Sequence, residues 1–325
     1  MTIHMEMARR HRPLVVLLGP TAVGKSRVAI QVAKYFDTEI LTADSRQVYR
    51  EMDIGTDKPT AEDRQVVRHQ LLDLVNPDEA FNTGWYRRAA LEHIERLYAA
   101  DRLPFVVGGT GLYIRTLVRG LCPAPQADPT VRAELKQLRE QGGRDGLYAE
   151  LTRVDPAAAA RLHQNDEAKV MRALEVYRLS GRLMSEMQAE HRFQEAPFSS
   201  LLIGLQRTKE TLYRRIDERI DWQLAHGMVE ETRALLDRGY GRELGSMKGL
   251  GYRHIGAYLA NECDDTEMVR LFKRDTRRFA KRQMTWFRKE PGVEWFLIDE
   301  GEPLEQVGRR VIARIERFLS RHGIH

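Results

Sequence analysis

The chain has 325 residues, of which 42% are hydrophobic and 30% are charged, with a formal net charge of +5. A chain of this size and composition can bury the core of one large and one smaller domain, and its modest positive charge only hints at a polyanionic partner. Cys122 and Cys263 lie far apart and outside any Cys/His cluster, which argues against a disulfide scaffold or a zinc site and indicates a reducing compartment. Residues 1–12 lack the apolar segment of a secretory signal, and no long apolar run predicts a membrane span, so we expect a cytoplasmic protein.

The first predicted element is a short apolar strand at 14–18 that ends in a glycine-rich loop and is followed by a helix at 27–36. The loop matches the pattern GxxxxGK[ST] between a strand and a helix, which is the context that this phosphate-binding motif requires. Backbone N–H groups of such a loop point at phosphate oxygens, a lysine adds positive charge, and Ser26 offers a hydroxyl to Mg²⁺. The predicted phosphate-binding residues are Gly19, Pro20, Thr21, Ala22, Val23, Gly24, Lys25 and Ser26. Kinases, NTPases and transferases that release diphosphate all use such a loop, so other residues must decide among them.

Strands and helices then alternate, which predicts βαβ units and a doubly wound sheet. The further elements expected in this half are a strand at 39–43, a helix at 85–100, a strand at 104–107 and a helix at 110–118.

The alternation of strand and helix patterns ends after Gly120. Three prolines within 121–129 indicate a linker, and 130–180 shows helical patterns without a convincing strand. Strand patterns return at 199–205 and 294–298. We therefore expect an α/β fold, in which a P-loop core with a mainly parallel sheet flanked by helices carries a helical insertion domain. The core would comprise 1–120 and 198–325, and the insertion 121–197.

Polar residues follow the second and third strands of the core. Asp44 comes directly after a strand, where a carboxylate faces the ligand crevice of a parallel sheet. From position alone it is a general base, a water-mediated Mg²⁺ ligand or the N-cap of a short turn. The strand at 104–107 ends in Gly108 and Gly109 rather than in the carboxylate of an NTPase metal site, which weakens an NTPase interpretation. Thr110 is either a helix cap or a polar contact in the crevice.

At these residues the sequence resembles the tRNA dimethylallyltransferase family, also called tRNA isopentenyl-pyrophosphate transferases. The segments that carry the resemblance are GPTAVGKS at 19–26, ADSRQVY at 43–49, DIGTDKPT at 53–60, VVGGTGLY at 106–113, KGLGYR at 248–253 and AKRQMTWFR at 280–288. They spread over nearly the whole chain. A zinc finger, which eukaryotic members often append, is missing from this sequence, so we expect the bacterial type.

The resemblance implies an enzyme that transfers a dimethylallyl group from dimethylallyl diphosphate to the exocyclic amine of the adenine on the 3′ side of the anticodon. It implies that the P-loop and a Mg²⁺ ion hold the diphosphate, with Ser26 as the protein ligand of the metal. Asp44 would be the base that takes the proton of the amine, and Thr21 would line the channel near the diphosphate. Arg215 and Arg219 share a helix face, and the resemblance favours Arg219 as part of the diphosphate clamp. The alternative is a solvated face on which these arginines pair with Asp217, Glu218 and Asp221.

The resemblance also implies an RNA partner, the anticodon stem-loop of tRNA, contacted by the helical insertion and by residues of the core. The matching positions are Asp44, Ser45, Arg46, Gln47, Thr110, Arg132, Ala168, Lys169, Val170, Met171, Arg172, Lys248, Gly249, Leu250, Gly251, Tyr252 and Arg253. We expect a monomer.

A long basic helix near the C-terminus carries nine arginines and lysines between 270 and 289, which is typical either of a solvated face or of a surface that follows RNA phosphates. Three other functions share parts of this pattern: a P-loop kinase of small molecules, an isopentenyltransferase acting on free adenine nucleotides, and an RNA-binding NTPase switch. The insertion and the basic helix argue against the second, and the missing carboxylate after the third strand argues against the last.

Overall fold

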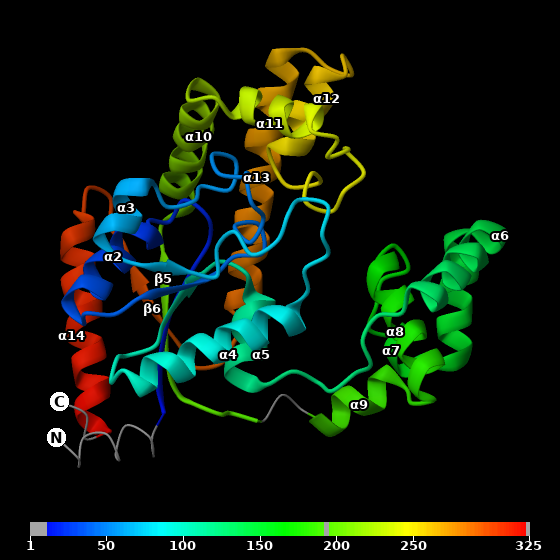
Figure 1. Ribbon diagram of the computed structural model, residues 1–325, viewed down its shortest axis with the longest axis horizontal. Coiled ribbons are helices and arrows are strands. Elements are labelled where there is room, and N and C mark those ends of the chain that lie inside the picture. Colours follow the sequence, from blue (N-terminus) through cyan, green and yellow to red (C-terminus); the bar gives the residue numbers. More distant parts are fainter. Residues whose placement is uncertain (1–11, 192–194, 323–325) are drawn as a thin grey trace. The chain divides into compact units, whose positions relative to one another are not determined.

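The computed structural model describes residues 12–191 and 195–322 (Figure 1). The chain forms two compact units, one from 1–118 and 197–325, the other from Arg119–Ala196. The insertion was predicted at 121–197. Residues 1–11, for which no secretory signal is predicted, lie outside the described residues.

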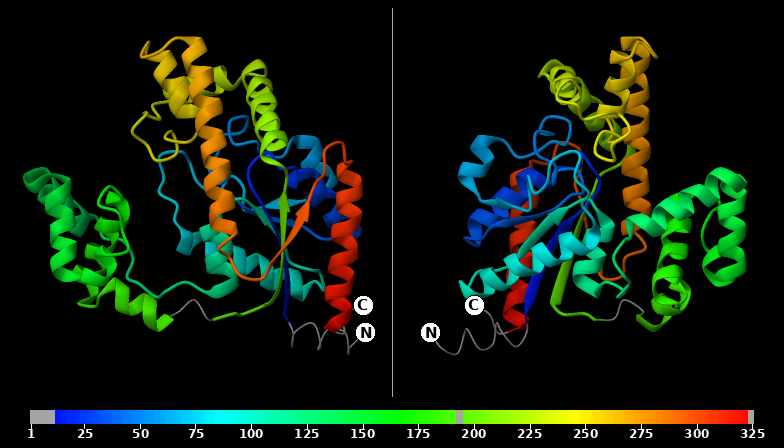
Figure 2. Two further views of the ribbon diagram at one scale, coloured as in Figure 1. Left: turned by 180° about the vertical axis from the view of Figure 1, so that it is seen from behind. Right: turned by 45° about the vertical axis from the view of Figure 1, so that its right-hand side comes forward.

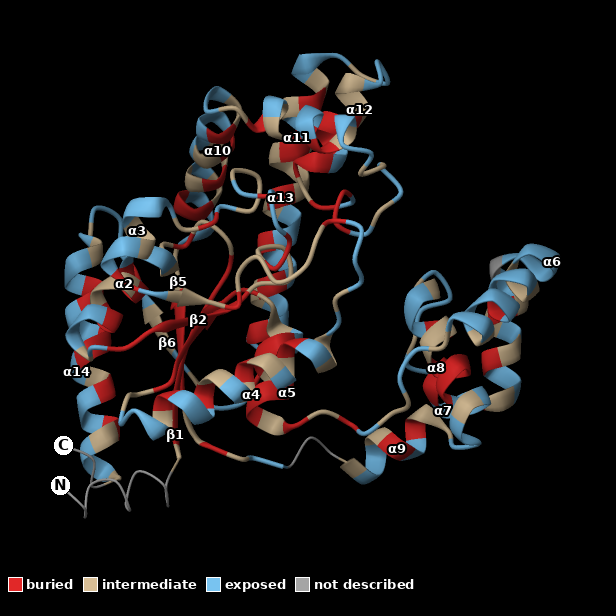
Figure 3. Ribbon diagram, viewed as in Figure 1, coloured by how far each residue is buried: buried red, intermediate tan, exposed pale blue. Residues whose placement is uncertain are grey.

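One sheet forms the centre of the first unit, and all of its strand pairs are parallel. The strands in spatial order are β3 (His69–Gln70), β2 (Ile40–Ala43), β4 (Phe105–Gly108), β1 (Pro13–Leu18), β5 (Ser199–Gln206) and β6 (Val293–Leu297). The apolar run of β1 is buried throughout because helices cover both faces of the sheet, as Figure 3 shows. The predicted fold class, a mainly parallel α/β sheet flanked by helices, is confirmed.

Alternate side chains of β1 enter two separate cores. Val15 and Leu17 pack with α2 and α14 on one face, and Leu14 and Val16 pack with α4 and α5 on the other. The long helix α13 runs beside α10 and ends near α5 (Figure 2). The helices of this unit are α2 (Lys25–Tyr35), α3 (Ala61–Val66), α4 (Thr83–Ala99), α5 (Gly111–Arg119), α10 (Lys209–Ala225), α11 (Met228–Asp237), α12 (Tyr252–Leu259), α13 (Asp265–Phe287) and α14 (Leu304–Arg321).

The second unit is helical in its described residues and has its own apolar core. Asp155 caps α7 through its side chain, as the Asp-Pro pair predicts, and also accepts a hydrogen bond from the Ser185 N–H. Gly181 ends α8 with a left-handed φ of 69°, a conformation that glycine adopts without strain. The helices of this unit are α6 (Pro129–Val154), α7 (Pro156–Ala159), α8 (Glu167–Ser180) and α9 (Met184–His191).

Two short elements of the core have no counterpart in the sequence prediction. Strand β3 has only two residues and pairs with Ile40 and Leu41 at the sheet edge, without an apolar run that could reveal it. Helix α3 has six residues and no buried side chain, so it lacks an apolar face; a capping box between Thr60 and Asp63 fixes its start.

Gly108 allows β2 and β4 to come together at the edge where the ligand crevice opens. A Cβ atom on Gly108 would lie 2.1 Å from the Ala43 carbonyl oxygen, which belongs to the backbone and cannot rotate away. We therefore expect Gly108→Ala to destabilise the protein by about 2–4 kcal/mol, the range of strongly overpacked sites. Urea unfolding followed by circular dichroism measures this change. Gly245→Ala is the matched control, because a Cβ there meets open space; equal stabilities of the two variants would contradict the close approach.

Candidate active site

Three strands end at one edge of the sheet, and the loops that follow them enclose a cavity of about 730 Å³. The P-loop follows β1, Asp44 follows β2, and Gly109 follows β4, so one crevice receives all three. Side chains from other elements that also line it include Gln47, Thr56, Asp57, Arg215, Arg219 and Trp222.

The P-loop backbone adopts left-handed conformations that need glycine or external support. Gly19 has φ 151° and Gly24 has φ 111°, while Ala22 adopts φ 61° although it carries a Cβ. Two arginines hold the strained segment: Arg215 donates to the Ala22 carbonyl oxygen at 3.0 Å, and Arg207 donates to that of Val23 at 3.1 Å. These bonds place two guanidinium groups beside the loop, where their positive charge would stabilise a bound anion.

Lys25 turns its ammonium group back onto the loop and donates to the carbonyl oxygens of Gly19 and Pro20 at 3.0 and 2.7 Å. Burial lowers the pKa of Lys25 to about 8; Arg219 also lowers it, whereas Asp44 and Asp57 raise it. With this pKa the Lys25 amine is mostly protonated near neutral pH, and its charge is balanced by the two carbonyl oxygens and the two carboxylates. An anionic ligand would stabilise the charged form further.

Asp44 and Thr110 join the ends of β2 and β4. Asp44 Oδ1 accepts from the Arg46 N–H at 2.8 Å, and Thr110 Oγ1 accepts from the Ser45 N–H at 3.0 Å. The Thr110 N–H in turn donates to the Ala43 carbonyl oxygen at 3.1 Å. Thr110 thus ties the end of β4 to the turn after β2, and Asp44 accepts a hydrogen bond within that turn while its carboxylate lines the cavity.

Gln283, on α13, connects the P-loop to β4. Its amide oxygen accepts from the Thr21 N–H at 2.9 Å, and its amide nitrogen donates to the Gly109 carbonyl oxygen at 2.9 Å. The prediction gave Gln283 no role, although it lies within the segment at 280–288 that carries the resemblance. Gly109 must remain without a Cβ here, since that atom would lie 2.5 Å from the Gln283 amide nitrogen.

Arg219 lines the cavity and pairs with Asp57 at 3.2 Å. The ion pairs named for the alternative do not form: Asp217 binds Arg277, Asp221 binds Lys273, and Glu218 lies 3.9 Å from Arg214. The prediction did not include Asp57 among the site residues.

The residues predicted to contact RNA in the core gather on one side of the cavity. Arg46 donates to the Gly245 carbonyl oxygen at 2.7 Å, which brings 44–47 against the segment that precedes 248–253. Lys248 and Arg253 are exposed, whereas the Tyr252 side chain is buried. Any RNA contact at Tyr252 would therefore involve its backbone.

The other predicted RNA contacts lie in the helical unit. Arg132 and Arg172 both bind Glu175, whose side chain is fully buried, at 2.8 and 2.6 Å. Val170 is buried, and Lys169 is exposed. The two arginines thus stabilise this unit whether or not they also contact RNA.

The basic helix α13 divides into two parts. Its first part pairs with acids: Arg270 with Glu267, Lys273 with Asp221, Arg277 with Asp217, and both Arg274 and Arg278 with Asp275. Beyond it, Lys281, Arg282, Arg288 and Lys289 are exposed around Trp286, over which Arg115 stacks at 4.3 Å. The solvated-face interpretation describes the first part better, and the second part remains a candidate surface for phosphates.

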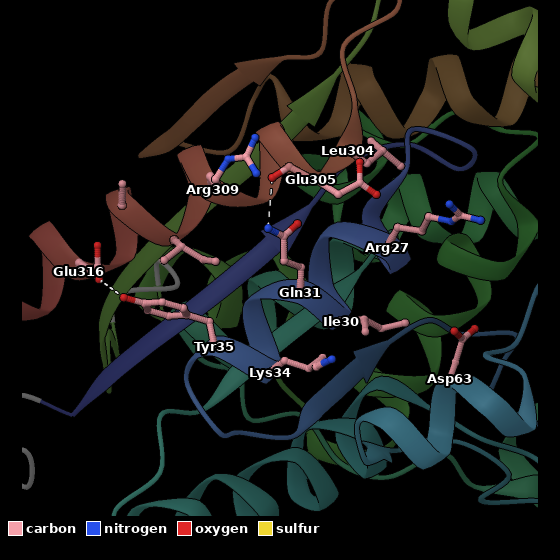
Figure 4. A pocket seen from close by; sticks show the side chains of 12 residues that line it. Arg27, Ile30, Gln31, Lys34, Tyr35, Asp63, Leu304, Glu305, Arg309 and Glu316 are labelled. Atoms are coloured by element: carbon pink, nitrogen blue, oxygen red, sulfur yellow. Dashed lines mark hydrogen bonds between the residues drawn. The ribbon is translucent and has the colours of Figure 1, made fainter.

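A second hollow of about 680 Å³ lies between α2 and α14 (Figure 4). Gln31 and Tyr35 are already engaged there, with the Glu305 carbonyl oxygen and the Glu316 carboxylate. Its charged walls hold three cations and three carboxylates, namely Arg27, Lys34, Arg309, Asp63, Glu305 and Glu316. This balance gives an anion little advantage, so the P-loop cavity is the candidate active site.

The oxygen donors that line the cavity include Ser26, Asp44 and Asp57. Mg²⁺ prefers such ligands and is commonly held by one or two of them together with waters and substrate phosphates. The described residues contain no group of three or more His, Cys, Asp or Glu side chains arranged to hold a metal ion.

Comparison with known proteins places the chain in a family. A family model described as IPP transferase matches residues 47–290. The tRNA dimethylallyltransferase of Geobacter sulfurreducens is 48% identical over 87% of this chain and 91% of its own length. The chain belongs to the IPP transferase family. The family member of the same name from Syntrophobacter fumaroxidans is 46% identical over 87% of this chain and 83% of its own.

Solved structures of the family share the fold. The full-length tRNA isopentenylpyrophosphate transferase of Bacillus halodurans superposes with a TM-score of 0.72 at 35% identity, over 96% of this chain and 98% of its own. A eukaryotic dimethylallyltransferase acting on tRNA gives a TM-score of 0.83 at 28% identity, over 95% of this chain and 80% of its own. No helix among the described residues is long and apolar enough to cross a membrane.

Proposed function

We propose that this chain transfers a dimethylallyl group from dimethylallyl diphosphate to the exocyclic amine of the adenine on the 3′ side of the anticodon in tRNA. As a member of a family whose relatives carry out tRNA prenylation, it is a tRNA-modifying transferase. The observation that carries the proposal is that a P-loop lysine and the Asp44 carboxylate line one cavity, so that a diphosphate and a proton acceptor can act on the same reaction.

At the donor end, the P-loop, Lys25 and Arg219 would bind the diphosphate, and Thr21 would line the channel beside it. The allylic C–O bond breaks with both electrons going to the diphosphate oxygen, and these cations stabilise the charge that develops there. Arg219 would keep one N–H on Asp57 and bind the ligand with its other N–H groups. Ser26 would hold a Mg²⁺ ion together with phosphate oxygens and water, and the metal would further neutralise the leaving group.

At the acceptor end, the adenine amine forms the new C–N bond and Asp44 takes up its proton. The amine is a weak nucleophile because its lone pair is delocalised into the purine, so a positioned base assists the bond formation. The adenine belongs to a stacked loop, and its amine reaches the carboxylate only after the base leaves the stack. Water must be kept from the allylic cation, and we propose that the bound substrates themselves close the cavity to it.

RNA binding would involve the cavity rim at 44–47, Thr110 and 248–253, and the helical unit through Arg132 and 168–172. Single-stranded loops expose base edges that proteins can read, which suits an anticodon loop. We propose that the enzyme acts as a monomer in the cytoplasm, a reducing compartment that suits the free thiols of Cys122 and Cys263.

The test is transfer of radiolabel from dimethylallyl diphosphate to unmodified tRNA with Mg²⁺, followed by nucleoside analysis of the product. We expect label in a single adenine on the 3′ side of the anticodon. A folded protein that transfers no label to competent tRNA but moves phosphate from ATP to a hydroxyl would overturn the proposal in favour of a small-molecule kinase. Label on free adenine nucleotides but not on tRNA would indicate the nucleotide isopentenyltransferase instead.

A further inference from the structure

One wall of the P-loop cavity is formed by the segment 53–60, which lies between β2 and α3 and contains no helix or strand. Thr56, Asp57 and Pro59 of this segment line the cavity together with residues of the P-loop. Asp57 adopts a left-handed φ of 57°, a strained conformation for a residue with a Cβ. Such a segment keeps its shape only if other groups hold it.

A single carboxylate, that of Glu231 on α11, organises the start of this wall. Its Oε2 accepts from the N–H groups of Asp53 and Ile54 at 3.0 and 2.7 Å, and its Oε1 accepts from that of Gly55 at 3.1 Å. Three successive backbone donors thus converge on one side chain, which is an arrangement that an ionised carboxylate stabilises strongly. Gln223, on the neighbouring α10, binds the Ile54 carbonyl oxygen at 2.6 Å.

Two further side chains hold the rest of the wall. The buried ammonium group of Lys58 donates to Asp53 and Asp73, each at 2.6 Å. Gln47 donates to the carbonyl oxygens of Thr56 and Asp57 at 3.0 and 2.9 Å. Because Asp57 pairs with Arg219, the position of the wall also sets the position of a cation in the cavity.

Glu231 also reaches the segment that is predicted to contact tRNA. The Tyr252 hydroxyl donates to Glu231 Oε1 at 2.6 Å, so this oxygen is shared between Tyr252 and Gly55. Burial and the Glu231 charge hold the pKa of Tyr252 well above its usual value, so its hydroxyl stays a donor. The Tyr252 ring also fills the space that a Cβ on Gly55 would need.

We propose that Glu231 is a positioning residue of the donor cavity: it holds the backbone of 53–55, thereby fixes Thr56 and Asp57 in the wall of the cavity, and joins this wall to 248–253 through Tyr252. The inference rests on the proposed function only in taking a diphosphate as the ligand of the cavity. Binding of RNA at 248–253 would then steady the wall against which the donor diphosphate binds.

Glu231→Gln tests the proposal with little change of shape. The amide nitrogen of glutamine would face backbone N–H groups that require an acceptor, so two of the four donors lose their partner. The donors that lose it are either the amides of Asp53 and Ile54 or the Gly55 amide with the Tyr252 hydroxyl, according to which oxygen the amide nitrogen replaces. We expect the affected amides to exchange hydrogen about tenfold faster or more, and Mg²⁺–inorganic diphosphate to bind about tenfold more weakly by calorimetry. In the transfer assay, KM for the allylic diphosphate should rise more than kcat falls.

Glu230→Gln is the matched control, since this exposed neighbour on the same helix turn undergoes the same chemical change. It should exchange and bind as the wild type does. Tyr252→Phe keeps the ring and removes one of the two donors to Oε1, and we expect it to speed exchange at Gly55 and weaken diphosphate binding about threefold. If Glu231→Gln does not fold, Tyr252→Phe decides the question.

The proposal would be overturned if both Glu231→Gln and Tyr252→Phe exchanged hydrogen and bound diphosphate as the wild type does. Faster exchange with unchanged affinity and KM would also overturn it, because Glu231 would then contribute to stability alone. A wild-type protein that binds no diphosphate and transfers no label contradicts the proposed function instead. The exchange measurement needs no ligand, so it still shows in that case whether Glu231 holds the wall.

Discussion

Replacing Asp44 by asparagine should lower the rate of prenyl transfer by about 10²- to 10⁴-fold, the usual contribution of a general base. Asparagine keeps an oxygen that can accept from the Arg46 N–H, so the turn after β2 is retained. It cannot take a proton from the adenine amine. Single-turnover transfer of labelled dimethylallyl groups to saturating tRNA measures the chemical step, and filter binding of tRNA shows whether the complex still forms.

Asp57→Asn is the control, since it removes a second carboxylate from the same cavity. It weakens the bond with Arg219, so we expect a smaller loss of activity. The value of kcat/KM should fall about tenfold, mainly because the allylic diphosphate binds more weakly. An equal loss in both variants would mean that the negative charge of the cavity matters rather than a particular base. Full activity of Asp44→Asn together with an inactive Asp57→Asn would assign the base to Asp57.

The parts of this structure that could be predicted from the sequence are those encoded by neighbouring residues. The apolar run of β1, the glycines of the P-loop and the start of α2 follow one another directly, so periodicity and motif place them together. The carboxyl ends of parallel strands meet at one edge, which brings Asp44 and Thr110 to the P-loop once the strands are recognised. The structure bears out this arrangement of the elements.

The parts that could not be predicted depend on contacts between distant residues. Glu231 lies in the first turn of an amphipathic helix, where a glutamate ordinarily faces solvent, and nothing local shows that it binds 53–55. Gln283 likewise lies in a basic helix, and only the fold brings its amide to Thr21. Segments 53–60 and 280–288 were recognised as part of a resemblance, but a resemblance without a role for each side chain does not reveal their hydrogen bonds.

Charge patterns are ambiguous for the same reason. Along α13 the cations outnumber the acids, which favours a phosphate-binding surface if the helix is considered alone. In the structure two of the acids that neutralise its first part, Asp217 and Asp221, come from α10. The other two, Glu267 and Asp275, belong to α13 itself. Sequence reasoning assigned Asp217 and Asp221 to the arginines of their own helix, because pairs at helical spacing are the only ones visible along a chain.

Replacing Lys25 by methionine should lower kcat/KM for the allylic diphosphate by about 10²- to 10³-fold, the usual cost of removing one group that stabilises a developing anion. Methionine keeps the length of the side chain and loses the charge. The Gly19 and Pro20 carbonyl oxygens lose their donor, so a modest fall in stability should accompany the change. Steady-state transfer kinetics measures the first effect and thermal unfolding the second.

The wild type should also lose affinity for diphosphate as the pH rises above about 8. Burial lowers the pKa of Lys25 to about 8 in the free protein, and the anion binds best to the protonated amine. The affinity is therefore fully present below this pKa and falls above it, by at most about tenfold per pH unit, because one proton is linked to binding. Calorimetric titrations from pH 6.5 to about 9.5 with Lys25→Met in parallel separate this effect from the titration of the ligand itself. If both proteins show the same pH dependence, Lys25 does not carry the charge that binds the diphosphate. Its bonds to the loop carbonyls would then be its main role.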